Sequence, residues 1–236
     1  LRTTGTTFYS WPVVMLPFME RNDIYKSIAG GSNPTTFVAN FICPSTPPDS
    51  QASPWLAYAG NAGSGANTTK WDGVMQDTSI TISGSTNGRV SMDDVSAGDG
   101  TAYTLILSEK CGAGLAATPW SLTTWNVNPT TYAYANSSSS LPVFGITGSG
   151  TTATKIINSG TVGAPSYTPG FYSQPHSNHP GGAVAAFCDN HTVFLKDSLS
   201  AKTYANLLNW DNSRRSATPG GNWVNTTDIL SDADYQ

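Results

Sequence analysis

The clearest pattern of apolar and polar positions lies near the C-terminus. Residues 183–187 are continuously apolar, and residues 192–195 form a second, largely apolar run. Asp189 and Asn190 lie between the two runs, and both residue types tolerate the left-handed backbone angles found in tight turns. This pattern predicts a β-hairpin that contributes to a hydrophobic core.

Three further segments carry strong patterns. Residues 103–109 are expected to form a strand that is apolar enough to be central in a sheet. Residues 17–28 are expected to form a helix, because a proline suits its first turn and two glycines follow its end. A final helix is expected over residues 201–209, with Ser200 as its N-cap.

The rest of the chain is less regular. Its shorter expected strands cover residues 37–43, 80–82 and 90–92. Residues 111–175 interleave aromatic residues with Thr, Asn, Pro and Ser, which indicates a large insertion of short strands and loops. Residues 211–236 are mostly polar and are expected to form a surface tail. The expected fold class is α+β, a single domain over residues 1–236 dominated by antiparallel β-sheet with a short helix near each end.

Composition limits the function classes. The chain has 236 residues, of which 11% are charged, and a net charge of −4. No basic stripe is present, so nucleic acid is not expected as a partner. No apolar run has the length of a membrane-spanning helix, and no signal peptide is evident. The three cysteines permit at most one internal disulfide, with Cys111–Cys188 as one pairing, Cys43 as another partner, and three free thiols as the alternative.

Five short segments, in order along the chain, resemble the motifs of one family. They read SWPVVMLPFME (residues 10–20), NFICPS (40–45), LAYAGN (56–61), VSMDDVSAGDGTAYTLILSE (90–109) and HPGGAVAAFCDN (179–190). The set is similar to that of prepilin-like bacterial surface proteins (type IV pilins and type II secretion pseudopilins) whose C-terminal domain is named for an H-x(9)-D-G signature. Here the signature ends in Asp-Asn in place of Asp-Gly, and residues 111–175 match poorly.

The resemblance implies a pilin-like head and an extracellular or cell-surface location in a bacterium. Such proteins begin with a short leader and a long apolar helix, and neither is in this sequence. We therefore expect the chain to be the soluble head of a longer protein or a naturally trimmed form, unless this subgroup has no membrane helix. A membrane would be contacted only through such a helix.

The C-terminal motif holds the densest set of candidate site residues. Its turn-forming members are interpreted as structural: His179, Pro180, Gly181, Gly182, Asp189 and Asn190. A transition-metal site built from His176, His179 and His191 is the competing interpretation. A nucleophile assembled from Ser177, His179 and Asp189 is disfavoured, because no nucleophile-elbow motif is present.

Two other sets of residues are weaker candidates. Asp93, Asp94 and Asp99 share one loop and could bind Ca²⁺ as a cofactor, although their spacing departs from the EF-hand pattern. Trp120 and Trp125 could stack on a sugar or another solute.

The favoured hypothesis is a non-enzymatic structural subunit that assembles with copies of itself into a filament or surface layer through protein–protein contacts. A carbohydrate- or solute-binding module that uses the aromatic insertion is the alternative, and a metal-dependent enzyme is a third.

Overall fold

The computed structural model describes about half of the chain. The described residues are 2–4, 7–32, 34–45, 47–48, 51–52, 55–63, 73–75, 89–109, 120–121, 143–145, 157–158, 174–212, 233 and 235.

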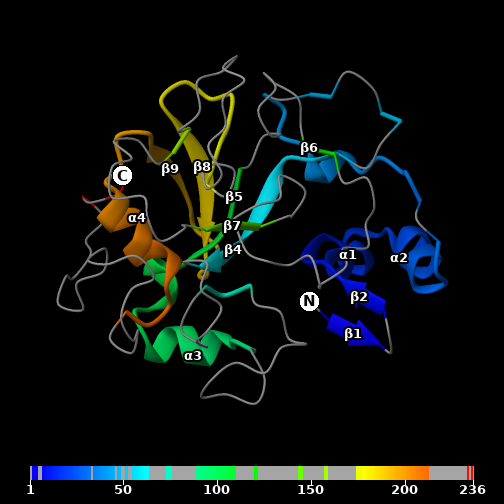
Figure 1. The fold of residues 1–236 in the computed structure, drawn as a ribbon, viewed down its shortest axis with the longest axis horizontal. Helices are drawn as coiled ribbons and strands as arrows, with labels where there is room; N and C mark the ends of the chain where they lie inside the picture. The colour runs from blue at the N-terminus through cyan, green and yellow to red at the C-terminus, as the bar shows by residue number, and fades with distance from the viewer. Residues whose placement is uncertain are drawn as a thin grey trace.

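A five-stranded sheet forms the centre of the molecule (Figure 1). Its strand order is β7-β4-β5-β8-β9, and every neighbouring pair is antiparallel except β4 and β7, which are parallel. The strands are β4 (Tyr58–Gly63), β5 (Leu105–Glu109), β7 (Val143–Gly145), β8 (Gly182–Phe187) and β9 (Thr192–Lys196). The expected mixture of helices and antiparallel sheet is confirmed, as is the central position of β5.

The C-terminal helix covers one face of this sheet. Helix α4 (Ala201–Leu208) begins at Ser200, whose side chain accepts a hydrogen bond from the backbone N–H of Thr203 and so satisfies a donor at the helix start. Its apolar residues share one core with the inward-facing residues of β5, β8 and β9. The core includes Leu105, Phe187, Leu195, Tyr204, Leu207 and Leu208, all fully buried.

The N-terminal elements form a second group around their own core, at the right of Figure 1. They are the hairpin of β1 (Arg2–Thr4) and β2 (Thr7–Tyr9), helix α1 (Trp11–Met15), the 3-10 helix η1 (Leu16–Met19) and helix α2 (Asn22–Ala29). The prediction of one continuous helix over residues 17–28 is therefore wrong. Glu20 has a left-handed backbone (φ 59°), which ends η1 before α2 begins.

The predictions of strands over residues 37–43 and 90–92 are also wrong. Residues 37–43 contain the 3-10 helix η2 (Ala39–Phe41), which buries Phe41 in the N-terminal core. Residues 90–92 lead into helix α3 (Met92–Ala97), because Ser91 and Asp94 form a capping box at its start. The expected strand over residues 80–82 lies outside the described residues.

The remaining elements are short. A 3-10 helix, η3 (Thr101–Tyr103), precedes β5, and β3 (Trp55–Leu56) pairs with β6 (Trp120–Ser121). Residues 111–175 thus contribute β6 and, through β7, one strand of the central sheet; most of that segment and of the tail over 211–236 lies outside the described residues. Within the described part of the chain, no helix has the length and apolarity needed to cross a bilayer.

Asn61 is a buried polar residue that joins three elements. Its amide nitrogen donates to the carbonyl of Leu105 at 2.8 Å and to that of Leu208 at 2.7 Å, and its oxygen accepts from the N–H of Gly63. Leu208 is the last residue of α4, where carbonyls have no partner within the helix. Asn61 therefore ties β4 to β5 and to the end of α4.

The β8–β9 connection explains the Asp-Asn turn. Phe187 and His191 are joined by a backbone hydrogen bond, so three residues form the loop. The third, Asn190, has φ 73°. A left-handed residue at this position is typical of three-residue hairpin loops, and glycine or asparagine adopts it most readily.

Replacing Asn61 by alanine should lower the free energy of unfolding by roughly 2–4 kcal/mol, because it leaves several buried backbone groups without partners. Urea denaturation followed by circular dichroism measures the change. The matched substitution Asn22→Ala, at an exposed position in the first turn of α2, should change it by less than about 0.5 kcal/mol. Equal effects of the two substitutions would contradict the role given to Asn61.

Substitutions at Asn190 test the turn. Asn190→Gly should leave the free energy of unfolding within about 0.5 kcal/mol of its original value, since glycine adopts positive φ without steric cost. Asn190→Val should lower it by about 1–2 kcal/mol, because a β-branched residue resists the left-handed region. Denaturant titration of both variants makes the comparison, and a valine variant as stable as the glycine variant would refute the assigned backbone.

Candidate functional site

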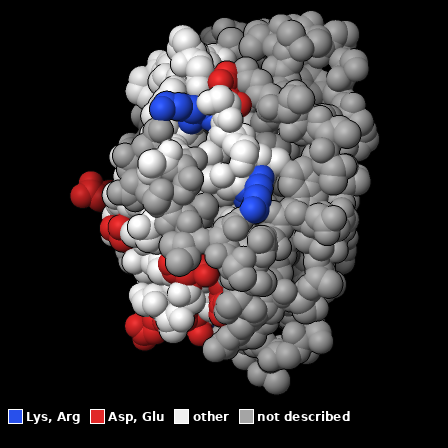
Figure 2. All heavy atoms as spheres, turned by 90° about the vertical axis from the view of Figure 1, so that its left-hand side faces the viewer, with Lys and Arg blue, Asp and Glu red and all other residues white. Residues whose placement is uncertain are grey.

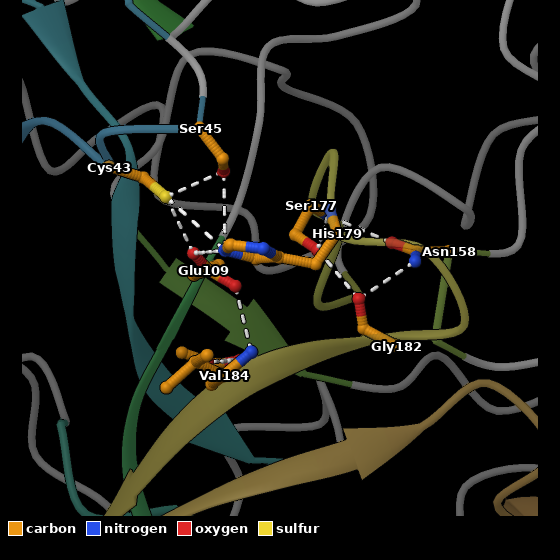
Figure 3. A network of polar contacts seen from close by, with 9 residues as sticks. Cys43, Ser45, Glu109, Asn158, Ser177, His179, Gly182 and Val184 are labelled. Carbon is orange, nitrogen blue, oxygen red and sulfur yellow. Dashed lines mark hydrogen bonds and ion pairs between the residues drawn. The ribbon is translucent and has the colours of Figure 1, made fainter.

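Three segments that are far apart in the sequence meet at one group of side chains (Figure 3). Cys43 follows η2, Glu109 is the last residue of β5, and His179 lies just before β8. Cys43 and Glu109 are 66 positions apart, and Glu109 and His179 are 70 positions apart. We call Cys43, Glu109 and His179 the polar junction.

Glu109 is the centre of the polar junction. Its side chain is only 3% exposed. Oε1 accepts a hydrogen bond from the Cys43 thiol at 2.8 Å and lies 3.1 Å from His179 Nε2, while Oε2 accepts from the backbone N–H of Val184 at 2.7 Å. A buried carboxylate is costly unless hydrogen bonds satisfy it, and these three contacts do so.

Ser45 lies beside the other three side chains. Its hydroxyl is 3.0 Å from Cys43 Sγ and 3.2 Å from His179 Nε2, and these last two atoms are 3.5 Å apart. A ring nitrogen carries either a hydrogen or a lone pair, and a carboxylate only accepts, so Nε2 donates to Glu109 Oε1 and the Ser45 oxygen can receive only a share of the same hydrogen. Cys43 and Ser45 come from the NFICPS segment, Glu109 ends the fourth motif, and His179 begins the fifth.

A hydrogen-bonded turn holds His179 in place. Ser177 Oγ accepts from the N–H of His179 and donates to the carbonyl of Gly182 at 2.6 Å. Asn158 donates to the same carbonyl and accepts from the N–H of Ser177. These bonds make the approach to β8 rigid, so the imidazole has a defined position.

Glycine is required at positions 181 and 182 of the turn for two different physical reasons. Gly181 has φ 83°, a conformation that side chains disfavour. At Gly182 a Cβ would lie 2.1 Å from the carbonyl oxygen of Leu195, so no side chain fits. Pro180 precedes them at the turn, and the geometry is consistent with the structural interpretation of residues 179–182.

The three histidines do not converge. His191 pairs with Asp189 and stacks on Phe187 with ring centroids 4.3 Å apart, at the hairpin loop that follows β8. The backbone N–H of His176 donates to the carbonyl of Glu109, Nδ1 of its ring is buried with no hydrogen-bond partner in the part of the chain that the structure describes, and burial lowers the pKa of the ring. Among the described residues, His179 is the one histidine that joins a group of potential metal ligands, and its companions are Cys43 and Glu109.

The three aspartates proposed as calcium ligands do not form a common site. Asp94 belongs to the capping box of α3, Asp99 accepts from Asn212, and Asp93 is exposed. The three carboxylates form no ligand group among the described residues. Burial raises the pKa of Asp99. Neither the Trp120 side chain nor Trp125 is among the described features, so the aromatic binding site stays a prediction.

The thiols of Cys43 and Cys188 are free and buried. The pairing of Cys188 with Cys111 is therefore not formed, and Cys111 itself lies outside the described residues. Burial and the hydrogen bond to Glu109 raise the pKa of Cys43, so the thiol keeps its proton at neutral pH. A protonated thiol that donates to a carboxylate is a poor nucleophile.

Sequence reasoning singled out His179 but did not include Cys43 or Glu109 in a site. The sequence did hold one indication that Cys43 and Glu109 belong to a site. Each is a polar or thiol residue that follows an apolar segment within a family-like motif. The distances of 66 and 70 positions conceal their proximity.

Comparison with models of protein families identifies the family of this chain. Residues 1–202 match the model described as "Protein of unknown function (DUF1559)". The chain belongs to the DUF1559 family. This is a family of bacterial surface proteins that often have prepilin-like features. Comparison with curated proteins and with solved structures gives no significant match.

Because Cys188 is buried, we expect the free energy of unfolding to fall at alkaline pH. Burial, together with the nearby Asp189 charge, raises the pKa of Cys188 from 9.0 to about 11. Between these values the unfolded chain releases a proton that the folded chain keeps, so the contribution of this thiol to stability is constant below pH 9.0 and falls as the pH rises toward 11. The expected slope for this group is up to about 1.4 kcal/mol per pH unit.

Denaturant titrations at a series of pH values measure this slope. Cys188→Ala should lower the overall stability but reduce the slope, leaving the parts due to Cys43 and Tyr204, whose pKa values burial also raises. An unchanged slope in Cys188→Ala would show that this thiol is not the titrating group.

Proposed function

We propose that this chain is a structural, pilin-like or pseudopilin-like subunit of an extracellular bacterial assembly, and that it acts through protein–protein contacts without turnover. The supporting observation is that the polar residues of the family-like motifs are engaged in internal hydrogen bonds. Glu109 binds Cys43 and the backbone of Val184, and Ser177 binds the backbone of the His179 turn.

These bonds support a scaffold and do not favour an enzyme. A nucleophile needs an adjacent base and a lowered pKa. At the polar junction the thiol donates to a carboxylate and its pKa is raised. The hydroxyl of Ser177 donates to a carbonyl within its own turn, and Asp189 pairs with His191 and not with His179.

Exposed apolar side chains supply candidate contact surfaces. Val184 and Phe194 are 37% and 40% exposed on the outer face of β8 and β9, and β9 ends the described sheet. Phe18 of η1 is 80% exposed, with Met15 of α1 nearby in sequence. Exposed apolar groups and unpaired strand edges are features through which copies of a chain can associate.

The charge distribution agrees with this proposal. On the face drawn in Figure 2, the Lys and Arg side chains among the described residues are few and separated. The low charge of the whole chain, 11% of residues, reduces the repulsion between like subunits.

Self-association of the purified chain tests the proposal. Sedimentation velocity over a range of concentrations, with electron microscopy of the concentrated sample, should reveal oligomers or filaments. Replacing Phe194 or Phe18 by serine should weaken association by about tenfold or more for whichever surface is used, since buried aromatics dominate interface energies.

Met92→Ser is the matched control, because Met92 is 50% exposed on α3, away from both surfaces. It should leave association unchanged. Uniform monomers at high concentration, with native termini verified by mass spectrometry, would contradict the proposal.

A further inference from the structure

The polar junction brings together the three kinds of ligand that zinc accepts. Cys43 Sγ, Glu109 Oε1 and His179 Nε2 all lie within 4.8 Å of one another. The Sγ–Oε1, Oε1–Nε2 and Sγ–Nε2 separations are 2.8, 3.1 and 3.5 Å. Zn²⁺ is bound by cysteine sulfur, histidine nitrogen and carboxylate oxygen, and it prefers four ligands at the corners of a tetrahedron.

These separations are close to those that a tetrahedral ion requires. With ordinary zinc–ligand bond lengths, neighbouring ligand atoms lie about 3.3–3.6 Å apart. The Sγ–Nε2 and Oε1–Nε2 separations need little adjustment. The Sγ–Oε1 separation must widen by less than about 1 Å, and this is the pair now joined by the thiol hydrogen.

We propose that Cys43 Sγ, Glu109 Oε1 and His179 Nε2 bind a single Zn²⁺ ion. On coordination, a sulfur–zinc bond replaces the sulfur–hydrogen bond, and that proton passes to solvent. His179 binds through the lone pair of Nε2, so the ring hydrogen that faces Glu109 is exchanged through solvent to Nδ1. The Ser45 hydroxyl, 3.0 Å from Sγ and 3.2 Å from Nε2, lies next to the fourth position, which is filled by that hydroxyl or by water.

The surrounding structure holds the ligands for this purpose. Val184 donates its N–H to Glu109 Oε2, which leaves Oε1 directed at the junction. Ser177 accepts from the N–H of His179 and fixes the turn that carries the imidazole. Hydrogen bonds that orient metal ligands in this way strengthen binding.

Solvent can reach the site from one side. The His179 side chain is 33% exposed and Ser45 is exposed, whereas Glu109 and Cys43 are buried. An ion can therefore enter past His179 and Ser45 and be held by the deeper carboxylate and sulfur. The single thiolate and imidazole favour zinc over Ca²⁺ or Mg²⁺, which prefer oxygen ligands alone.

Metal titration of the tag-free chain tests the proposal. The protein is stripped with a chelator and titrated with ZnCl₂ in a calorimeter, and separately with Co²⁺ while the absorption spectrum is recorded. The expected result is one zinc per chain, a thiolate-to-cobalt charge-transfer band that zinc abolishes, and a higher melting temperature with zinc. Failure to bind one equivalent of zinc would overturn the proposal.

Variants locate the ion. Cys43→Ser should remove the charge-transfer band and weaken zinc binding at least about a hundredfold. Cys188→Ser is the matched control, because it changes the second buried free thiol among the described residues and should leave both readouts intact. Glu109→Gln keeps an oxygen for the N–H of Val184 but removes the charge, and it should also weaken binding. Binding that persists in Cys43→Ser would place the ion elsewhere and refute the assignment.

A labelling experiment on the unmodified chain covers the case in which a variant does not fold. Zinc should slow alkylation of Cys43 and leave that of Cys188 unchanged, as read by peptide mass spectrometry. Equal rates with and without zinc would refute the proposal. Zinc stoichiometry per chain, the cobalt band and the protection of Cys43 are read at one site within each chain, so their outcome is separate from that of the self-association test.

Discussion

The buried carboxylate of Glu109 is the constraint on which the junction of the described segments depends. An unpaired charge at this depth would cost several kcal/mol, so the fold must bring it donors. The thiol comes from one end of the chain and the Val184 N–H from the other, and both are held by Glu109 at the end of the central strand β5. A single side chain thereby couples the position of the NFICPS segment to that of the C-terminal hairpin.

Much of the regular structure could be predicted from sequence. The β8–β9 hairpin, β5 and α4 were predicted because each has a local pattern strong enough to identify it: continuous apolar runs for the strands, and the Ser200 cap for the helix. The hairpin loop also follows from composition, because its left-handed position suits asparagine.

The errors have identifiable physical causes. Residues 37–43 are apolar enough for a strand, but Phe41 reaches the N-terminal core from a 3-10 turn, a difference that a short apolar run cannot reveal. The α3 helix did have a signal, since Ser91 and Asp94 have the spacing of a capping box. The break at Glu20 had none, because glutamate rarely adopts a left-handed conformation. The polar junction could not be derived from the sequence, because local patterns carry no information on long-range contacts. Cys43 and Glu109 are separated by 66 positions, and Glu109 and His179 by 70.

The same separations affect the entropic cost of inserting residues into the chain. Contacts among Cys43, Glu109 and His179 divide most of the chain into two closed loops, and the second contains residues 111–175. The entropy lost on closing a flexible loop grows only with the logarithm of its length, at about 0.6 kcal/mol for each doubling. Residues inserted between the anchoring positions, outside the strands of the central sheet, should therefore add little to the entropic cost of folding.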